Sequence, residues 1–117
     1  MGKSWVLIYE ADRVFREAML IKWGAPDRIK CCTCHHFFIP DFIDVGHILG
    51  RARSFAVRWY EPNVLPQCRH CNRTMDGNNI VNCISAEEYQ RIFTIAHDRS
   101  FRLTDEFIQE VINKYTL

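Results

Sequence analysis

Two pairs of cysteines carry the clearest chemical signal in the sequence. Cys31 and Cys34 are separated by two residues, and Cys68 and Cys71 repeat this spacing after the intervening residues 35–67. Two CxxC pairs on one chain are typical of a tetrahedral zinc site with four thiolate ligands. In a reducing compartment such spacing favours metal binding over disulfides. We therefore expect these four cysteines to hold one structural Zn²⁺ ion.

Two neighbours of the first pair also have ligand spacing. Cys32 and His35 are alternatives to Cys31 and Cys34, which we prefer because their spacing mirrors that of the second pair. The remaining cysteine, Cys83, is expected to be a buried apolar side chain, as free cysteines commonly are.

One histidine and two asparagines near these pairs have side chains suited to metal-assisted hydrolysis. His47 follows a glycine, Asn63 precedes the second pair, and Asn72 directly follows it. A histidine with an ordinary pKa of ~6.5 can take a proton from water at neutral pH. Asn63 suits the role of tying a hairpin so that the ring keeps its orientation. The side-chain oxygen of Asn72 suits a hard ion such as Mg²⁺ or Mn²⁺.

The second ligand of that divalent ion is expected to be Asp44, the acid nearest to His47 in the sequence. In a plain strand, residues three apart point to opposite faces. Asp44 therefore needs a turn or bulge at Gly46, the residue type that permits one, to reach the site. Three other residues stay open as ligands: His70, Asp76 and Asn78.

Positive charge is concentrated in the same part of the chain. The whole chain has 15 Lys and Arg against 14 Asp and Glu, a net charge of +1. That is too small for a protein that binds nucleic acid by charge alone. Residues 47–73, however, contain five arginines, no lysine and one acid. We expect four of these arginines to form a basic face that can contact phosphate groups: Arg51, Arg53, Arg58 and Arg73.

These residues must be positioned by helices and short strands. Residues 4–23 predict one helix, which Ser4 caps and Gly24 ends. Residues 35–49 and 55–61 are rich in β-branched and aromatic side chains, and they predict two short strands.

Three further helices are expected in the second half of the chain. They cover residues 69–75, 85–97 and 104–115, and Ser85 with Glu88 predicts a capping box at the start of the second of them. The result is an α+β domain, in which zinc staples a β-hairpin to a helix and further helices flank this unit on both sides.

The order of these features resembles the HNH, or ββα-metal, family of endonucleases. His47, Asn63 and Asn72 stand in its three signature positions, and Gly46 stands where the commonest family version has a metal-binding Asp. The sequence resembles phage recombination nucleases of the NinG/Rap type still more closely, over residues 28–95. The motifs that carry this resemblance are Cys31/Cys34, Gly46-His47, Arg58-Trp59, Asn63-Val64, Gln67-Cys68, Cys71-Asn72 and Gly77-Asn78.

The resemblance implies one nuclease domain with a helix at residues 1–26, a zinc-pinned ββα-metal core at residues 28–83 and helices at residues 84–117. It implies a metal-dependent endonuclease that hydrolyses DNA phosphodiester bonds. Its substrates would be branched intermediates of phage DNA recombination, such as Holliday junctions and D-loops. The alternative from another class is a non-catalytic, zinc-stapled DNA-binding or adaptor module with a degenerate HNH site.

The expected partners are DNA and a recombination protein, and the expected location is the cytoplasm of a bacterial host cell. No apolar run approaches the ~18 residues that a membrane span needs. The apolar segment near the start is also shorter than that of a signal peptide.

A homodimer through residues 85–117 is a further expectation, because their apolar surface exceeds what a small zinc core needs for its own cover. The alternative is that these helices pack on the N-terminal helix of the same chain. The apolar residues concerned are Phe93, Ala96, Phe107, Ile108, Val111, Ile112 and Tyr115.

Overall fold

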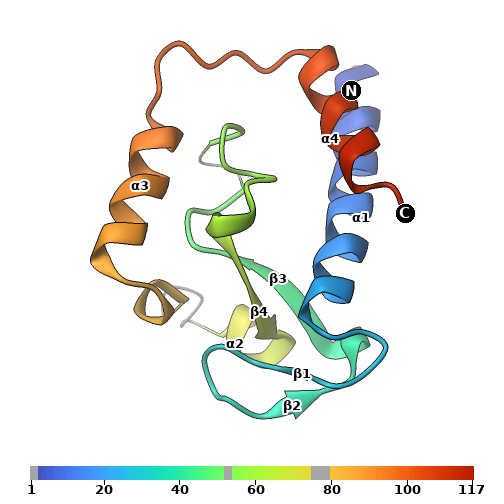
Figure 1. Ribbon diagram of the computed structural model, residues 1–117, viewed down its shortest axis with the longest axis vertical. Coiled ribbons are helices and arrows are strands. Elements are labelled where there is room, and N and C mark those ends of the chain that lie inside the picture. Colours follow the sequence, from blue (N-terminus) through green and yellow to red (C-terminus); the bar gives the residue numbers. More distant parts are fainter. Residues whose placement is uncertain (1–2, 52–53, 75–79) are drawn as a thin grey trace.

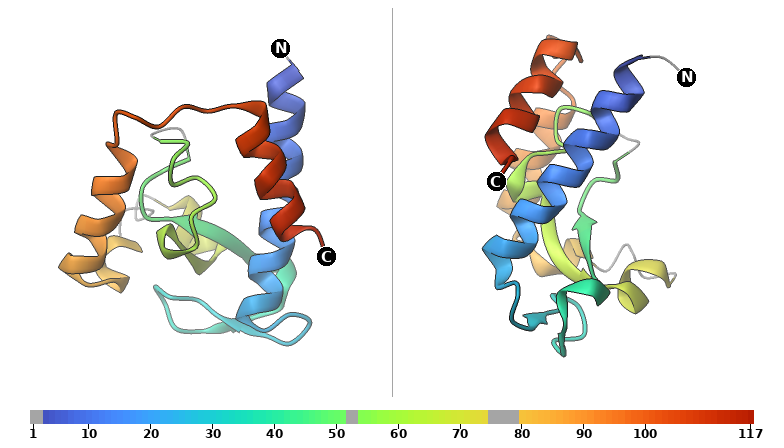
Figure 2. Two further views of the ribbon diagram at one scale, coloured as in Figure 1. Left: turned by 45° about the horizontal axis from the view of Figure 1, so that its top comes forward. Right: turned by 90° about the vertical axis from the view of Figure 1, so that its right-hand side faces the viewer.

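The computed structural model describes residues 3–51, 54–74 and 80–117, and it confirms the predicted α+β class. Two small antiparallel hairpins lie between helices, with α1 and α4 side by side on one flank and α3 on the other (Figure 1). The first hairpin, β1–β2, lies at the end of the molecule where α1 ends, next to α2 (Figures 1 and 2).

α1 (Lys3–Trp23) is the first predicted helix. Its apolar residues recur at helical spacing, so Ile8, Ala11 and Phe15 form one buried stripe. Gly24 follows the helix with a φ of 135°, a conformation that favours glycine. The predicted cap is wrong, because Ser4 lies inside the helix and its hydroxyl donates a hydrogen bond to Asp105 Oδ1 at 2.9 Å.

The strands form two separate hairpins. β1 (Ile29–Lys30) pairs with β2 (Phe37–Phe38), and β3 (Ile43–His47) pairs with β4 (Val64–Cys68). In the second hairpin the register is continuous, with the first residue of β3 opposite Cys68 and its last residue opposite Val64. The histidine that ends β3 therefore lies across from the start of β4, and a zinc-ligand candidate ends β4.

Only the first of the two predicted strand regions is correct. A 3-10 helix, η1 (Pro40–Phe42), separates β2 from β3 within that region. Residues 55–59 form turns and η2 (Glu61–Asn63) is a second 3-10 helix, so the partner strand β4 follows the region where it was predicted. Val57 and Trp59 are buried in this turn region. Their large apolar side chains therefore serve packing, and they do not indicate an extended backbone here.

Within the described residues, three α-helices follow β4. α2 (Arg69–Arg73), α3 (Ala86–Ala96) and α4 (Asp105–Tyr115) confirm the three predicted helices. The capping box is confirmed as well, since Ser85 Oγ accepts from the Glu88 N–H at 3.1 Å and Glu88 Oε1 accepts from the Ser85 N–H at 3.3 Å. Within the described residues, no helix combines the length and apolarity needed to cross a membrane.

α4 packs along α1 and buries most of its own apolar stripe there. Ile108 is fully buried, Val111 and Tyr115 are each 8% exposed, and the Tyr115 ring meets Phe15 edge to face with centroids 4.9 Å apart. The apolar surface of α4 that predicted a homodimer is thus covered within the chain, as in the alternative interpretation. The homodimer was predicted from apolar surface thought to be uncovered, and the surface of α4 no longer supports that prediction.

α3 does not pack on α1. It covers the other side of the second hairpin. Its Ile92 packs with Ile48, Val57 and Ile80 in a separate buried cluster. The long segment between α3 and α4 crosses the top of the molecule in Figure 1, and it connects these two flanks. The hairpin that carries the candidate site is therefore held from both sides.

Candidate active site and metal centre

The four predicted zinc ligands come together beside the two hairpins. The Sγ atoms of Cys31, Cys34, Cys68 and Cys71 all lie within 4.8 Å of one another. Cys31 follows β1, Cys34 lies in the turn after it, Cys68 ends β4 and Cys71 lies in α2. Three of these residues are buried and Cys34 is partly exposed. The cluster can therefore hold a metal ion such as zinc.

Backbone N–H groups point at two of these sulfurs. Cys31 Sγ accepts from the N–H of Thr33 at 3.3 Å and of Cys34 at 3.5 Å, and Cys68 Sγ accepts from the N–H of Cys71 at 3.4 Å. Burial raises the pKa of the Cys31 thiol, but backbone donors outweigh burial and lower its pKa to about 7. Because the thiolate is the form that binds metal, these donors favour the state that an ion requires at Cys31. At Cys68 burial outweighs the donor from Cys71, and the pKa of that thiol is raised.

The alternative ligands lie outside this cluster. Cys32 and His35 do not belong to the group of four sulfurs, which agrees with the choice of Cys31 and Cys34. The prediction for Cys83 is wrong, because this residue is exposed and its thiol donates a hydrogen bond to the Cys32 carbonyl at 3.1 Å.

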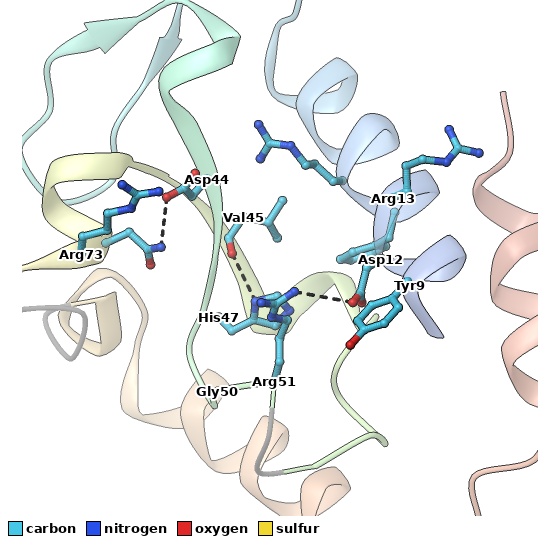
Figure 3. A pocket seen from close by; sticks show the side chains of 12 residues that line it. Tyr9, Asp12, Arg13, Asp44, Val45, His47, Gly50, Arg51 and Arg73 are labelled. Carbon is cyan, nitrogen blue, oxygen red and sulfur yellow. Dashed lines mark hydrogen bonds and ion pairs between the residues drawn. The ribbon is translucent and has the colours of Figure 1, made fainter. Parts of the chain in front are cut away.

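A cleft of about 800 Å³ lies between α1, β3 and α2 (Figure 3). Three residues predicted for the catalytic site line it, namely Asp44 and His47 from β3 and Asn72 from α2. α1 forms another wall, although it precedes these residues in the sequence by a whole hairpin. The fold therefore gathers the candidate catalytic side chains around one opening.

The imidazole of His47 lies between two backbone carbonyls. Nε2 is 2.9 Å from the Arg58 carbonyl oxygen, and Nδ1 is 3.2 Å from that of Val45. A neutral imidazole carries one N–H, and we assign it to Nε2 because that contact is the shorter. Nδ1 then carries the lone pair that can accept a proton. His47 lines the cleft, and the Val45 carbonyl oxygen lies beside Nδ1.

Several groups around the ring set its charge state. Burial lowers the pKa of His47, and the nearby charges of Arg51 and Arg58 lower it further. The two carbonyls act in the opposite direction, but the net shift is downward. The ring is therefore neutral at neutral pH, which is the form that can accept a proton.

Asn63 ties the segment that follows β3 to the start of β4. Its side chain is fully buried. Its Oδ1 accepts from the Leu49 N–H at 2.9 Å, and its Nδ2 donates to the carbonyls of Leu49 at 3.1 Å and Val57 at 3.0 Å. Asn63 thus fixes the backbone at Leu49, just after β3, and at Val57. It was expected to tie the hairpin in this way.

Asp44 and Asn72 lie beside each other in the cleft. Asn72 Nδ2 donates a hydrogen bond to Asp44 Oδ2 at 3.1 Å, and Arg69 Nε lies 3.5 Å from the other carboxylate oxygen. Figure 3 shows Asp44 on the α2 side of β3 and His47 on the α1 side. The two residues thus reach one cleft from opposite faces of the strand.

The bulge at Gly46 that was expected to turn Asp44 to the face of His47 is absent, so the two side chains remain on opposite faces of β3. β3 pairs with β4 in unbroken register through Gly46, which lies opposite Leu65. The glycine serves close packing instead, because a Cβ atom there would lie 2.6 Å from Ile80 Cδ1 and 3.0 Å from Gln67 Oε1. Of the alternative ligands, His70 is exposed and does not line the cleft, and Asp76 and Asn78 lie outside the described residues.

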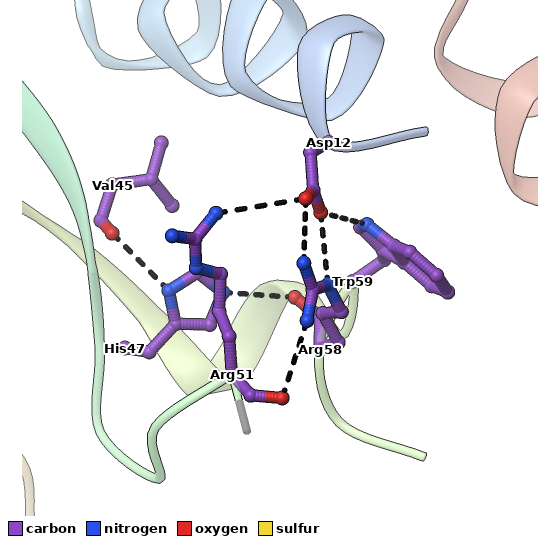
Figure 4. A network of polar contacts seen from close by, with 6 residues as sticks. All are labelled: Asp12, Val45, His47, Arg51, Arg58 and Trp59. Carbon is purple, nitrogen blue, oxygen red and sulfur yellow. Dashed lines mark hydrogen bonds and ion pairs between the residues drawn. The ribbon is translucent and has the colours of Figure 1, made fainter. Parts of the chain in front are cut away.

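The four predicted phosphate-binding arginines divide into three groups. Arg51 and Arg73 are exposed and line the cleft. The prediction for Arg58 is wrong, because its guanidinium is buried and forms an ion pair with Asp12 at 2.6 Å, so it is not available to a phosphate (Figure 4). Arg53 lies outside the described residues.

α1 contributes cleft residues that the sequence patterns did not indicate. Arg13 and Arg16 line the cleft from this helix, and Arg16 Nη1 donates to the Ile43 carbonyl at 3.0 Å. Asp12 lines it too, and binds Arg58. No local motif marks these residues, since only the packing of α1 beside β3 brings them to the site.

Comparisons of the chain with protein-family models, with curated proteins and with solved structures find no match. We therefore draw the function from the residues of the cleft, from their geometry and from the motifs of the sequence.

Proposed function

We propose that this chain is a divalent-metal-dependent DNA endonuclease of the HNH type. In this proposal β3, β4 and α2 form the ββα-metal core, and one Zn²⁺ bound to the four cysteines staples it. The observation that carries the proposal is the single cleft lined by His47, Asp44 and Asn72. A neutral imidazole and two oxygen-bearing side chains in one cleft are what metal-assisted hydrolysis of a phosphodiester needs.

His47 acts as the general base. With its proton on Nε2, held by the Arg58 carbonyl, Nδ1 takes a proton from the attacking water. Asn63 keeps this geometry by fixing the backbone next to the strand that carries the histidine. Its role is therefore to position the base rather than to touch the substrate.

Asp44 and Asn72 are the ligands of the divalent ion. Their side chains already meet, and carboxylate and amide oxygens suit Mg²⁺ and Mn²⁺. In this structure the Asn72 amide donates its N–H to Asp44. To bind one ion together with Asp44, the amide would have to rotate and present its oxygen instead. When bound, the ion supplies positive charge that stabilises the negative charge developing on the phosphate.

Arginines on both walls of the cleft bind phosphates that flank the scissile bond. Arg51 follows β3, Arg73 ends α2 and Arg16 lies on α1, a distribution that suits a backbone running between them. Arg13, also on α1, is already paired with Glu10 and Glu17. The resemblance to phage recombination nucleases supports branched DNA as substrate, with a recombination protein as partner in the host cell. The small net charge agrees with selection of DNA shape rather than with strong binding of any duplex.

The proposal predicts that purified, zinc-loaded protein nicks a labelled four-way junction in Mg²⁺, leaves 5′-phosphate ends and is inactive after chelation of Mg²⁺. Linear duplex of the same sequence is the matched substrate, and we expect it to be cut more slowly. The protein should shift both DNAs on a gel in Ca²⁺. A clear gel shift without cleavage in Mg²⁺ or Mn²⁺ would instead support the adaptor alternative.

A further inference from the structure

The carboxylate of Asp12 on α1 binds three side chains from the segment between β3 and β4 (Figure 4). Its Oδ1 accepts from Arg58 Nε at 3.0 Å and from Trp59 Nε1 at 2.8 Å, and its Oδ2 accepts from Arg58 Nη2 at 2.6 Å. Arg51 Nη1 adds an ion pair at 3.5 Å from Oδ2. The partly buried carboxylate of Asp12 thus binds the guanidinium groups of both Arg51 and Arg58.

Arg58 is held at its side chain and contacts His47 with its backbone. Its side chain is 8% exposed, and its Nη1 also donates to the Arg51 carbonyl at 3.4 Å. Its own carbonyl oxygen lies 2.9 Å from His47 Nε2. Because a buried guanidinium without a carboxylate partner is unfavourable, Arg58 is expected to leave this place if Asp12 loses its charge. The carbonyl that orients the imidazole would then move.

We infer that Asp12 is a positioning residue for His47: it anchors Arg58, and through the Arg58 carbonyl it holds the imidazole with the proton on Nε2 and Nδ1 unprotonated. Asp12 lies on α1, outside the hairpin-and-helix core, so α1 belongs to the catalytic unit rather than only covering it. The catalytic consequence rests on the proposed function, whereas the effect on the ring does not.

The effect on the ring can be measured without DNA. The protein is labelled with ¹⁵N-histidine, and the two ring nitrogen shifts of His47 are recorded at about pH 8, well above the ordinary histidine pKa of ~6.5. In the wild type we expect the shifts of a single Nε2–H tautomer. In Asp12→Asn we expect the two shifts to move toward each other, as in a mixture of tautomers. Asp27→Asn makes the same chemical change at an exposed position just after α1 and is expected to leave these shifts unchanged.

The effect on catalysis separates positioning from simple destabilisation. For Asp12→Asn we expect kcat for junction cleavage to fall about 10- to 100-fold, as when a group that orients a reacting side chain is lost, with little change in KM. Arg58→Met should lower kcat similarly, and the double variant should be no slower than either single variant, because both act through one carbonyl. Asp27→Asn should cleave at the wild-type rate.

Two results would overturn the inference. One is unchanged His47 shifts in folded Asp12→Asn. The other is a double variant whose loss of kcat is the product of the two single losses. If the shifts move as expected but no form of the protein cuts DNA, the positioning role stands and the proposed function fails.

Discussion

Replacement of His47 by alanine is expected to lower the rate of junction cleavage by about 10²- to 10⁴-fold, the usual contribution of a general base. Among the described residues that line the cleft, His47 is the one histidine. Two backbone carbonyls hold its neutral imidazole in place. It carries no positive charge for the phosphates, so DNA binding should remain nearly unchanged. Single-turnover cleavage in Mg²⁺ and a gel shift in Ca²⁺ measure these two properties separately.

The matched control for this variant is His70→Ala. His70 lies on the exposed side of α2 and does not line the cleft, so its loss should leave cleavage unchanged. Circular dichroism of both variants checks that each is folded. Equal cleavage by wild type and by His47→Ala free of contaminating nuclease would rule out His47 as the base.

Replacement of Cys68 by serine is expected to abolish zinc binding and to unfold the protein. Structural zinc sites contribute about 10–16 kcal/mol of apparent binding free energy, whereas a domain has only about 5–15 kcal/mol of net stability. Cys68 ends β4, and its sulfur lies 4.0 Å from the Sγ of Cys34, which belongs to the other cysteine pair. Loss of this ligand therefore opens the connection between the two hairpins.

Elemental analysis and thermal denaturation of Cys68→Ser measure this effect, and Cys83→Ser is the matched control. Cys83 is exposed and lies outside the sulfur cluster, and a serine hydroxyl can donate to the Cys32 carbonyl as the thiol does. Cys83→Ser should keep one zinc per chain and a wild-type Tm. Wild-type protein that folds normally without zinc would refute a structural zinc site.

Much of the local structure was predictable, because the signals are local. The period of apolar residues in α1, the glycine after it and the box of Ser85 and Glu88 each act within a few residues. The repeated CxxC spacing likewise predicted which four cysteines meet. These features depend little on what the rest of the chain does.

β4 was missed because its sequence carries the wrong local signals. Pro66 lacks an N–H and is excluded from central strands, but each hairpin here has only two strands, so every strand is an edge strand. Residues 55–59 have strong strand propensity and still form turns. Their burial between α3 and α1 overrides that propensity, since Val57 packs with Ile92 and Trp59 packs with the residues of α1.

The electrostatics of the site could not be predicted, because they depend on which helix faces the hairpin. Arg58 is one of several arginines in a basic segment, and only the carboxylate of Asp12 turns it into a buried structural residue. Arg13 and Arg16 reach the cleft for the same reason. In the sequence these residues are separated from His47 by the whole first hairpin, and no spacing rule connects them.

Titration of Mn²⁺ into ¹⁵N-labelled, zinc-loaded protein tests most directly whether a divalent ion binds in the cleft that His47 lines. Paramagnetic Mn²⁺ broadens the amide signals nearest to it. We expect selective broadening of residues 43–47 and 69–73 at the lowest Mn²⁺ concentrations, and loss of this selectivity in Asp44→Asn. Uniform broadening, or broadening that begins at exposed acids such as Glu87 and Glu106, would contradict a metal site in the cleft.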